Sequence, residues 1–181
     1  MIRDVEKVLI NEDEISKIVS DLGQRITNEY KDSDKPLIVI IILKGSLIFA
    51  SDLVRKIDMP LDIEFMKVSS YGAGTKTSGE IKIHLDLNRE NLENYNLLIV
   101  EDIVDSGRTL SRLTQLLKNR NANNVKTCTL LDKPTRREVD FVPDFCGATI
   151  PDEFVVGYGL DYDEKYRNLP FVGILKREVY S

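Results

Sequence analysis

The chain has 181 residues, 42% of them hydrophobic and 30% charged, which suits one globular domain of about 100–200 residues. The net charge of −5 argues against a protein that wraps nucleic acid, because such proteins carry a basic excess. The longest apolar run, Leu37 to Leu43, is far shorter than the ~18 residues of a membrane span, and the N-terminus lacks a signal layout, so we expect a cytoplasmic protein without membrane contact.

The predicted elements alternate between helices and strands along the chain. Asn11 as an N-cap, with Glu14 three residues later, begins an amphipathic helix over residues 12–30. The apolar, mostly β-branched run 37–43 is typical of a strand that is buried on both faces, and a helical pattern follows it to about residue 58. Further strands are predicted over 61–68, 81–87, 97–100 and 125–131, with a helix between the last two that is marked by Leu110, Leu113, Leu116 and Leu117.

This order of elements predicts an α/β fold, with a mostly parallel central sheet flanked by helices, in a single domain over residues 1–181. Ligands of such sheets bind beyond the carboxyl ends of the strands, so the residues that follow each strand are the candidates for function. The polar, glycine-rich gap 69–80 is longer than a hairpin loop of about 2–5 residues and predicts a functional lid or a disordered tip.

The two cysteines and the single histidine limit the kinds of catalytic or metal site that the sequence predicts. Cys128 and Cys146 lie in or beside apolar stretches without a CxxC motif, so we expect two reduced, buried thiols and neither a disulfide framework nor a zinc site. His84, the single histidine, lies on the polar side of an alternating stretch and is expected at the surface. Acid–base chemistry is therefore expected from carboxylates, lysines or tyrosines.

The strongest functional pattern follows the strand at 97–100, where the chain reads Glu101-Asp102-Ile103-Val104-Asp105-Ser106-Gly107-Arg108-Thr109. Its last four residues open a helix, and the free N–H groups and positive dipole end at such a place favour a phosphate. Because carboxylates repel phosphate, the three acidic residues indicate a second task, which is to bind sugar hydroxyls or Mg²⁺. A phosphate, a sugar and a metal together suit a phosphorylated ribose, although the same residues also suit a strand end and a helix cap.

This string resembles the PRPP-binding motif of the type I phosphoribosyltransferases, with Ser106 where that family often has threonine. Nearly the whole chain matches in order: 43–46 is similar to the pyrophosphate loop, 69–72 to the start of the lid, 131–134 to the purine-recognising segment, and 151–162 with Arg167 to the base-binding hood of the 6-oxopurine branch. The resemblance implies the fold of that family, with a core of about 35–135 and a small hood of about 1–12 and 140–181.

The resemblance also implies a Mg²⁺-dependent transferase of purine salvage, which assembles as a homodimer or homotetramer and places Lys44 near a subunit contact. It would transfer the 5-phosphoribosyl group from PRPP to hypoxanthine and guanine, giving IMP and GMP with release of pyrophosphate, and Asp105 would accept the proton of the base. The ribose phosphate would contact Glu101, Asp102, Ser106, Gly107, Arg108 and Thr109. Pyrophosphate would contact Lys44, Gly45 and Arg167; the lid would include Ser70 and Tyr71. The purine would contact Lys133, Phe154, Val155 and Asp161, and the metal would be held by Glu101, Asp102 and Asp161.

Several alternatives remain open at this point. A phosphoribosyltransferase for another base is one; Lys133 disfavours adenine, since its ammonium donor would face the 6-amino donor, but it does not disfavour xanthine. A non-catalytic regulator on the same fold, which senses nucleotides and binds nucleic acid, is disfavoured by the acidic charge and the complete hood. A generic nucleotide-binding module is the third, and in that case Phe154 and Val155 are plain core residues.

Overall fold

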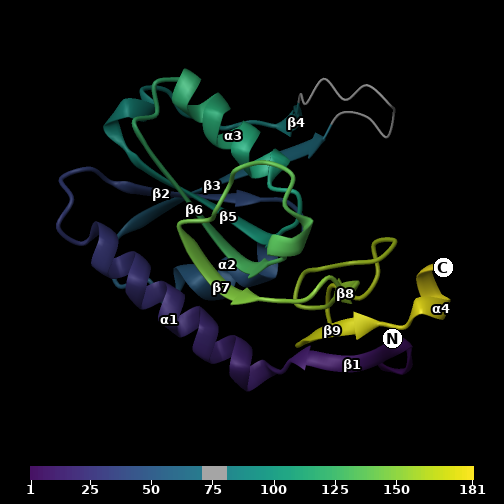
Figure 1. The fold of residues 1–181 in the computed structure, drawn as a ribbon. Helices are drawn as coiled ribbons and strands as arrows, with labels where there is room; N and C mark the ends of the chain where they lie inside the picture. Colours follow the sequence, from purple (N-terminus) through teal and green to yellow (C-terminus); the bar gives the residue numbers. More distant parts are fainter. Residues whose placement is uncertain (71–80) are drawn as a thin grey trace.

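The structure is a computed structural model that describes residues 1–70 and 81–181 (Figure 1). Among these residues, six strands form a central sheet in the spatial order β4 (Ile81–Leu85), β3 (Leu61–Ser70), β2 (Leu37–Ile42), β5 (Asn96–Val104), β6 (Asn124–Asp132) and β7 (Phe145–Thr149). Neighbouring strands run parallel except at the edge, where β4 is antiparallel to β3. The predicted α/β class with a mostly parallel sheet is confirmed.

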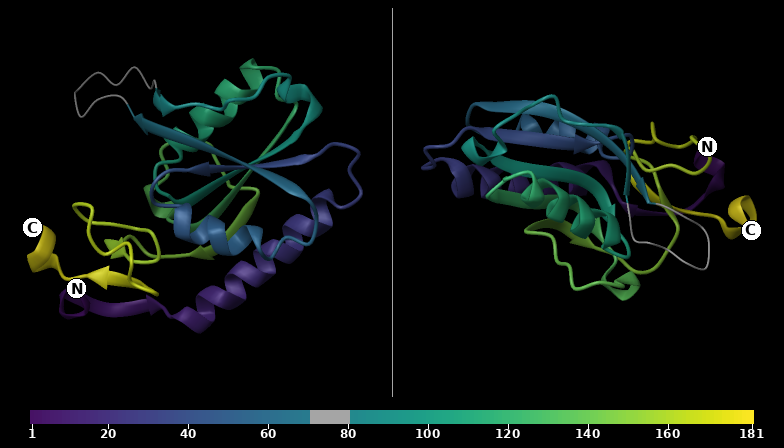
Figure 2. Two further views of the ribbon diagram at one scale, coloured as in Figure 1. Left: turned by 180° about the vertical axis from the view of Figure 1, so that it is seen from behind. Right: turned by 90° about the horizontal axis from the view of Figure 1, so that it is seen from above.

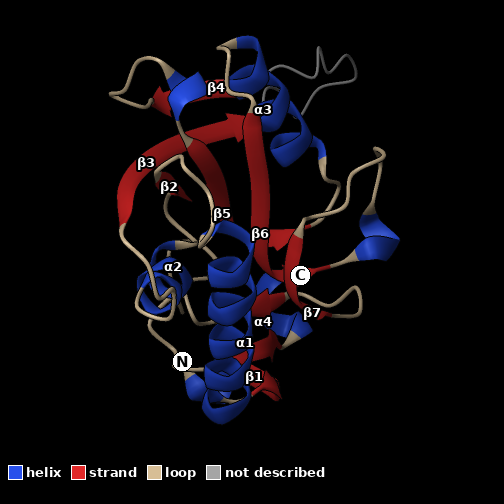
Figure 3. Cartoon of the chain, turned by 90° about the vertical axis from the view of Figure 1, so that its left-hand side faces the viewer, coloured by secondary structure: helices blue, strands red, loops and turns tan. Residues whose placement is uncertain are grey.

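Helices cover both faces of this sheet (Figure 3). On one face, α1 (Glu12–Tyr30) and α2 (Leu47–Val54) pack on the alternate β2 residues Leu37, Val39 and Ile41. On the other face, α3 (Arg108–Asn119) packs on Ile38, Ile40 and Ile42. Successive side chains of a strand point to opposite faces, so a strand between two helical layers is buried along its whole length, as β2 is.

Helix α1 begins and ends where the sequence predicts. The side chain of Asn11 accepts the Glu14 N–H at 2.9 Å, and the Glu14 carboxylate accepts the Asn11 N–H at 2.8 Å, which completes the capping box. One side of the helix is buried at Ile15, Val19, Leu22, Ile26 and Tyr30, a spacing that matches the helical period. None of the described helices is long and apolar enough to cross a membrane.

A second, smaller sheet forms the hood and joins the two ends of the chain (Figure 2). Its order is β1 (Val5–Ile10), β9 (Val172–Leu175) and β8 (Val155–Val156), and the neighbours are antiparallel. The N–H of Lys176, just before the short helix α4 (Arg177–Tyr180), donates to the Asp4 carbonyl at 2.9 Å. The hood therefore draws its strands from both ends of the chain.

Some boundaries differ from the sequence expectations. Strand β7 lies beyond residue 140, where the hood was expected to begin, yet it pairs with β6 in the central sheet. Helix α2 ends at Val54 rather than near residue 58, because the following turn packs on α1: a Cβ on Gly23 would lie 2.5 Å from the Lys56 carbonyl oxygen. The cysteines are free, as expected, although Cys146 is only half-buried, and burial raises the pKa of the Cys128 thiol.

Candidate active site

The turn between β5 and α3 forms a concave cradle at the carboxyl end of the sheet. Gly107 is the N-cap of α3 and has a φ of +78°, a conformation that glycine adopts without strain. The Arg108 N–H contacts the Ser106 hydroxyl oxygen at 3.3 Å, and the first helical N–H groups face a cavity of about 270 Å³. The cavity is lined by Glu101, Asp102, Ile103, Val104, Asp105, Ser106, Gly107, Thr109 and Leu110. The structure thus places the acidic cluster with Ser106, Gly107 and Thr109 around one cavity, whereas the Arg108 side chain pairs with Glu138 at 2.6 Å.

Glu101 and Asp102 lie inside β5, because the strand continues past the apolar run to Val104. Burial raises the pKa of both carboxyls, and for Glu101 the negative charge of Asp102 raises it further. The Ile103 N–H donates to Asp102 at 2.7 Å, but neither carboxylate forms an ion pair with any described side chain. Two adjacent acidic groups without a cationic partner favour a bound cation.

The β2–α2 loop lies against this acidic pair. A Cβ on Gly45 would lie 1.7 Å from an Asp102 carboxylate oxygen, so any larger residue would require that carboxylate or the loop to shift. On its other side, a Cβ on Gly159 would lie 2.1 Å from the Gly45 carbonyl oxygen, and Gly159 has a φ of +103°. Close packing of three segments therefore fixes the β2–α2 loop between β5 and the hood.

Basic side chains of the loop and the hood converge on Glu164. The Lys44 Nζ lies 2.8 Å from its carboxylate, and an Arg167 Nη lies 3.5 Å from it. The same guanidinium pairs with Asp161 at 3.0 Å and donates to the Gly159 carbonyl at 2.7 Å, which leaves its buried Nε without a partner among the described atoms. The structure brings Lys44, Gly45 and Arg167 together. The Lys44 ammonium and the Arg167 guanidinium both contact the Glu164 carboxylate, which occupies a place where another anion could bind.

The ends of β5 and β6 bring Lys133 and Asp105 together. Val104 and Asp132 are partners in the parallel ladder, so the residues that follow them are neighbours. The Lys133 Nζ lies 3.6 Å from an Asp105 carboxylate oxygen; Lys133 is only 8% exposed, whereas the Asp105 side chain is 49% exposed. A buried ammonium beside an accessible carboxylate presents a donor and an acceptor side by side.

The remaining predicted residues that the structure describes lie in the hood or at the end of β3. Val155 is buried in β8, and Phe154 beside it is partly exposed. Asp161 is turned to Arg167 and also accepts the Glu164 N–H at 2.8 Å. Ser70 is the last residue of β3, and Tyr71 lies outside the described residues. Their predicted roles, in binding a purine, binding a metal and forming a lid, stay predictions.

Two residues that the sequence analysis did not single out support the site. Arg137 donates to the Asp105 carbonyl at 2.7 Å and pairs with Asp132, so it anchors the backbone of the Asp105 turn. Glu164 holds both basic groups described above. No sequence motif marks either residue. Arg137 contacts the Asp105 turn and Glu164 contacts Lys44, and in both cases the partner lies far away in the sequence. A larger cavity of about 510 Å³ lies between α1, α2 and the 158–170 segment, apart from these groups.

Comparison with known proteins agrees with this fold. A family model described as a phosphoribosyl transferase domain matches residues 8–163, and the chain belongs to this family of phosphoribosyltransferases. It is 50% identical over 181 residues to the hypoxanthine-guanine phosphoribosyltransferase of Staphylococcus epidermidis, covering 100% of this chain and 99% of that protein. The crystal structure of a hypoxanthine phosphoribosyltransferase from Staphylococcus aureus matches it with a TM-score of 0.94 at 50% identity, covering 100% of this chain and 97% of that one.

The chain is also similar to part of a longer protein. It is 52% identical over 181 residues to the bifunctional protein TilS/HprT of Listeria monocytogenes, a match that covers 100% of this chain but only 28% of the length of that relative. The family membership and the fold class that the sequence resemblance implied are confirmed by these comparisons.

Proposed function

We propose that this protein transfers the 5-phosphoribosyl group from PRPP to hypoxanthine and guanine, giving IMP and GMP and releasing pyrophosphate. The observation that carries this proposal is the pair formed by Lys133 and Asp105, 3.6 Å apart beside the cradle at the start of α3. On a 6-oxopurine, the 6-oxo oxygen and N7 are neighbours on one edge of the ring system. One purine can therefore accept a hydrogen bond from Lys133 while its N7 faces Asp105.

The hydrogen-bond donors of Lys133 explain why a 6-oxopurine is the expected base. Lys133 offers only donors, and a 6-oxo group is an acceptor. Adenine carries an amino donor at the same position, so it would leave a buried ammonium without its partner. A site built around such a hydrogen bond rejects the wrong base by ~10⁴-fold or more.

Asp105 would accept the proton that the base loses as it attacks the sugar carbon. When the ribose–pyrophosphate bond breaks, negative charge grows on the leaving group, and the two cations at Lys44 and Arg167 lie where they can stabilise it. The pyrophosphoryl group of PRPP would displace Glu164 from both cations as the substrate binds. The 5′-phosphate would bind the N–H groups and hydroxyls of residues 106–109, since Ser106, Gly107 and Thr109 line the cavity at the helix N-terminus.

The acidic pair Glu101 and Asp102 fits Mg²⁺. No group of three or more metal-binding side chains occurs in the described part of the chain, and Mg²⁺ typically uses one or two protein carboxylates with substrate oxygens. Glu101 and Asp102 would hold the ion together with the ribose hydroxyls and the pyrophosphate, and Asp161 is the third candidate. Bound there, the ion would neutralise charge on the pyrophosphate as it leaves.

Removal of the metal is expected to weaken PRPP binding strongly. The net charge of −5 repels a polyanion, and without the cation PRPP would meet the Glu101 and Asp102 carboxylates directly. Isothermal titration of PRPP in Mg²⁺ buffer and after EDTA treatment measures the difference. Equal affinities in the two buffers would contradict a metal role for this pair, and return of binding when Mg²⁺ is restored is the control.

The proposed activity is tested by initial rates with hypoxanthine, guanine, xanthine and adenine at fixed PRPP and Mg²⁺. We expect pyrophosphate release with the first two bases and a kcat/KM for adenine lower by ~10⁴-fold. A high rate with xanthine alone would change the substrate to that base. Absence of release with every base, combined with a gel shift of RNA or DNA, would favour a regulator on this fold instead.

We also propose that the protein forms a homodimer or homotetramer with the β2–α2 loop near a subunit contact. The resemblance to the type I phosphoribosyltransferases supports this proposal, and Leu47, the first residue of α2, is an exposed apolar side chain next to that loop. Light scattering measures the mass of the assembly in solution, and a monomer at assay concentration would contradict the proposal.

A further inference from the structure

Aromatic rings from the hood and the C-terminus meet around Phe154. The Tyr180 ring stacks on the Phe154 ring, with centroids 4.6 Å apart and planes inclined by 22°. The Tyr162 ring approaches Phe154 at 5.7 Å with an angle of 87° between the planes. The sequence analysis assigned a role to Phe154 but none to Tyr162 or Tyr180.

The distances show how the three rings are arranged. The centroids of Tyr162 and Tyr180 lie 6.4 Å apart. Rings on the two opposite faces of Phe154 would be much farther from each other than this, so Tyr162 does not lie on the face of Phe154 opposite Tyr180. The other face has no aromatic neighbour among the described residues, and Phe154 is 37% exposed.

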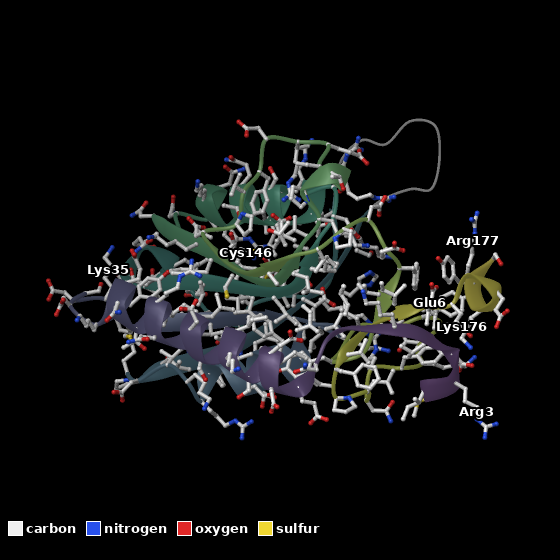
Figure 4. All side chains as sticks on the ribbon, turned by 60° about the horizontal axis from the view of Figure 1, so that its bottom comes forward. Arg3, Glu6, Lys35, Cys146, Lys176 and Arg177 are labelled. Carbon is white, nitrogen blue, oxygen red and sulfur yellow. The ribbon has the colours of Figure 1, made fainter. Side chains whose placement is uncertain are left out.

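Backbone hydrogen bonds connect Phe154, and the segment that carries Tyr180, to neighbouring parts of the hood. The Leu175 N–H donates to the Phe154 carbonyl at 2.9 Å, which ties Phe154 to the end of β9 just before α4. The Lys176 N–H bonds to Asp4, and Val179 packs on the buried cluster of the hood. Figure 4 shows α4 at the outer end of the hood, with Arg177 pointing away from the fold. Tyr180 is therefore directed at Phe154 by a segment that is anchored on both sides.

We propose that Tyr180 is a positioning residue for the purine, because its ring fixes the plane of Phe154 against which the base stacks. The inference rests on the proposed function, since it assigns the face of Phe154 opposite Tyr180 to the purine. A partly exposed phenyl side chain on its own samples several rotamers, and a base that stacks on it must order it first. A ring already stacked on the opposite face removes most of that ordering cost, so the effect should appear in base binding.

Substitutions of Tyr180 test this role. Tyr180→Leu removes the ring, and we expect the KM for hypoxanthine to rise about 3- to 10-fold, the range of one aromatic pair, with less than a twofold change in kcat and in the KM for PRPP. Tyr180→Met is a second variant without a ring, so the result does not depend on how one substitution folds. Tyr180→Phe and Tyr180→Trp keep the stacked ring and should retain the wild-type KM for hypoxanthine.

Arg177→Ala, on the same helix but exposed, is the matched control and should leave both KM values unchanged. A hypoxanthine KM that stays the same without the ring, or that falls because Tyr180 competes with the base, would overturn the inference. The inference would also be overturned if the hypoxanthine KM of Tyr180→Phe rose as much as that of Tyr180→Leu, because Tyr180→Phe keeps the ring. Failure of the proposed function is distinguishable, because the unchanged protein would then release no pyrophosphate with hypoxanthine.

Discussion

Replacement of Asp105 by asparagine is expected to lower kcat by about 10²- to 10⁴-fold, the contribution of a well-placed general base. The amide has nearly the shape of the carboxylate and still presents an oxygen to Lys133, 3.6 Å away in the structure. It cannot take the proton of the purine. The KM for PRPP should change little, because the cradle at residues 106–109 is untouched. Steady-state kinetics with hypoxanthine and PRPP separate the two parameters.

Asp140→Asn is the matched control for this experiment. Asp140 is an exposed carboxylate on the loop that follows Arg137, and the same chemical change there should leave kcat unaltered. A decrease below about tenfold at Asp105 would mean that this carboxylate is not the general base, and another proton acceptor would have to be sought. A large rise in the KM for PRPP with an unchanged kcat would move Asp105 from catalysis to substrate binding.

The second large effect is expected from Gly45→Ala. The added Cβ would lie 1.7 Å from an Asp102 carboxylate oxygen, so either that carboxylate or the whole β2–α2 loop must shift. A displacement of about 1 Å in a positioning group is enough to cost roughly 10²-fold in rate, and we expect this loss in kcat/KM for PRPP. The fold should survive, because β2 and α2 are held by their own buried residues. Circular dichroism melting checks that point.

A double-mutant cycle with Asp102→Ala identifies the cause of the loss. If the methyl group acts by displacing the Asp102 carboxylate, Gly45→Ala should add little once that carboxylate is gone, so the two effects would be far from additive. Fully additive losses would show that the loop itself had moved. Ser51→Ala, an exposed change on α2, is the control for small substitutions near this loop.

Local sequence patterns predicted α1 and β2 closely, since each depends on neighbouring residues. The capping box and the apolar spacing define α1, and an uninterrupted apolar run defines β2. The pattern was less accurate for β5, which was expected over 97–100 but continues to Val104. Polar residues such as Glu101 break the apolar run, yet they remain in the strand because β6 offers partners up to Asp132. Pairing with a distant segment decided that boundary.

The sequence by itself determined the α/β class, the turn of small residues at the start of α3 and the residue types of the candidate site, because helix caps, strand periodicity and motif order are local properties of the chain. Only the tertiary structure decided which of these residues meet. The 3.6 Å approach of Lys133 to Asp105, the close packing of Gly45 on Asp102 and the stack of Tyr180 on Phe154 each join segments far apart in sequence. Such contacts depend on strand order and on how the hood closes against the core, and no local pattern encodes them.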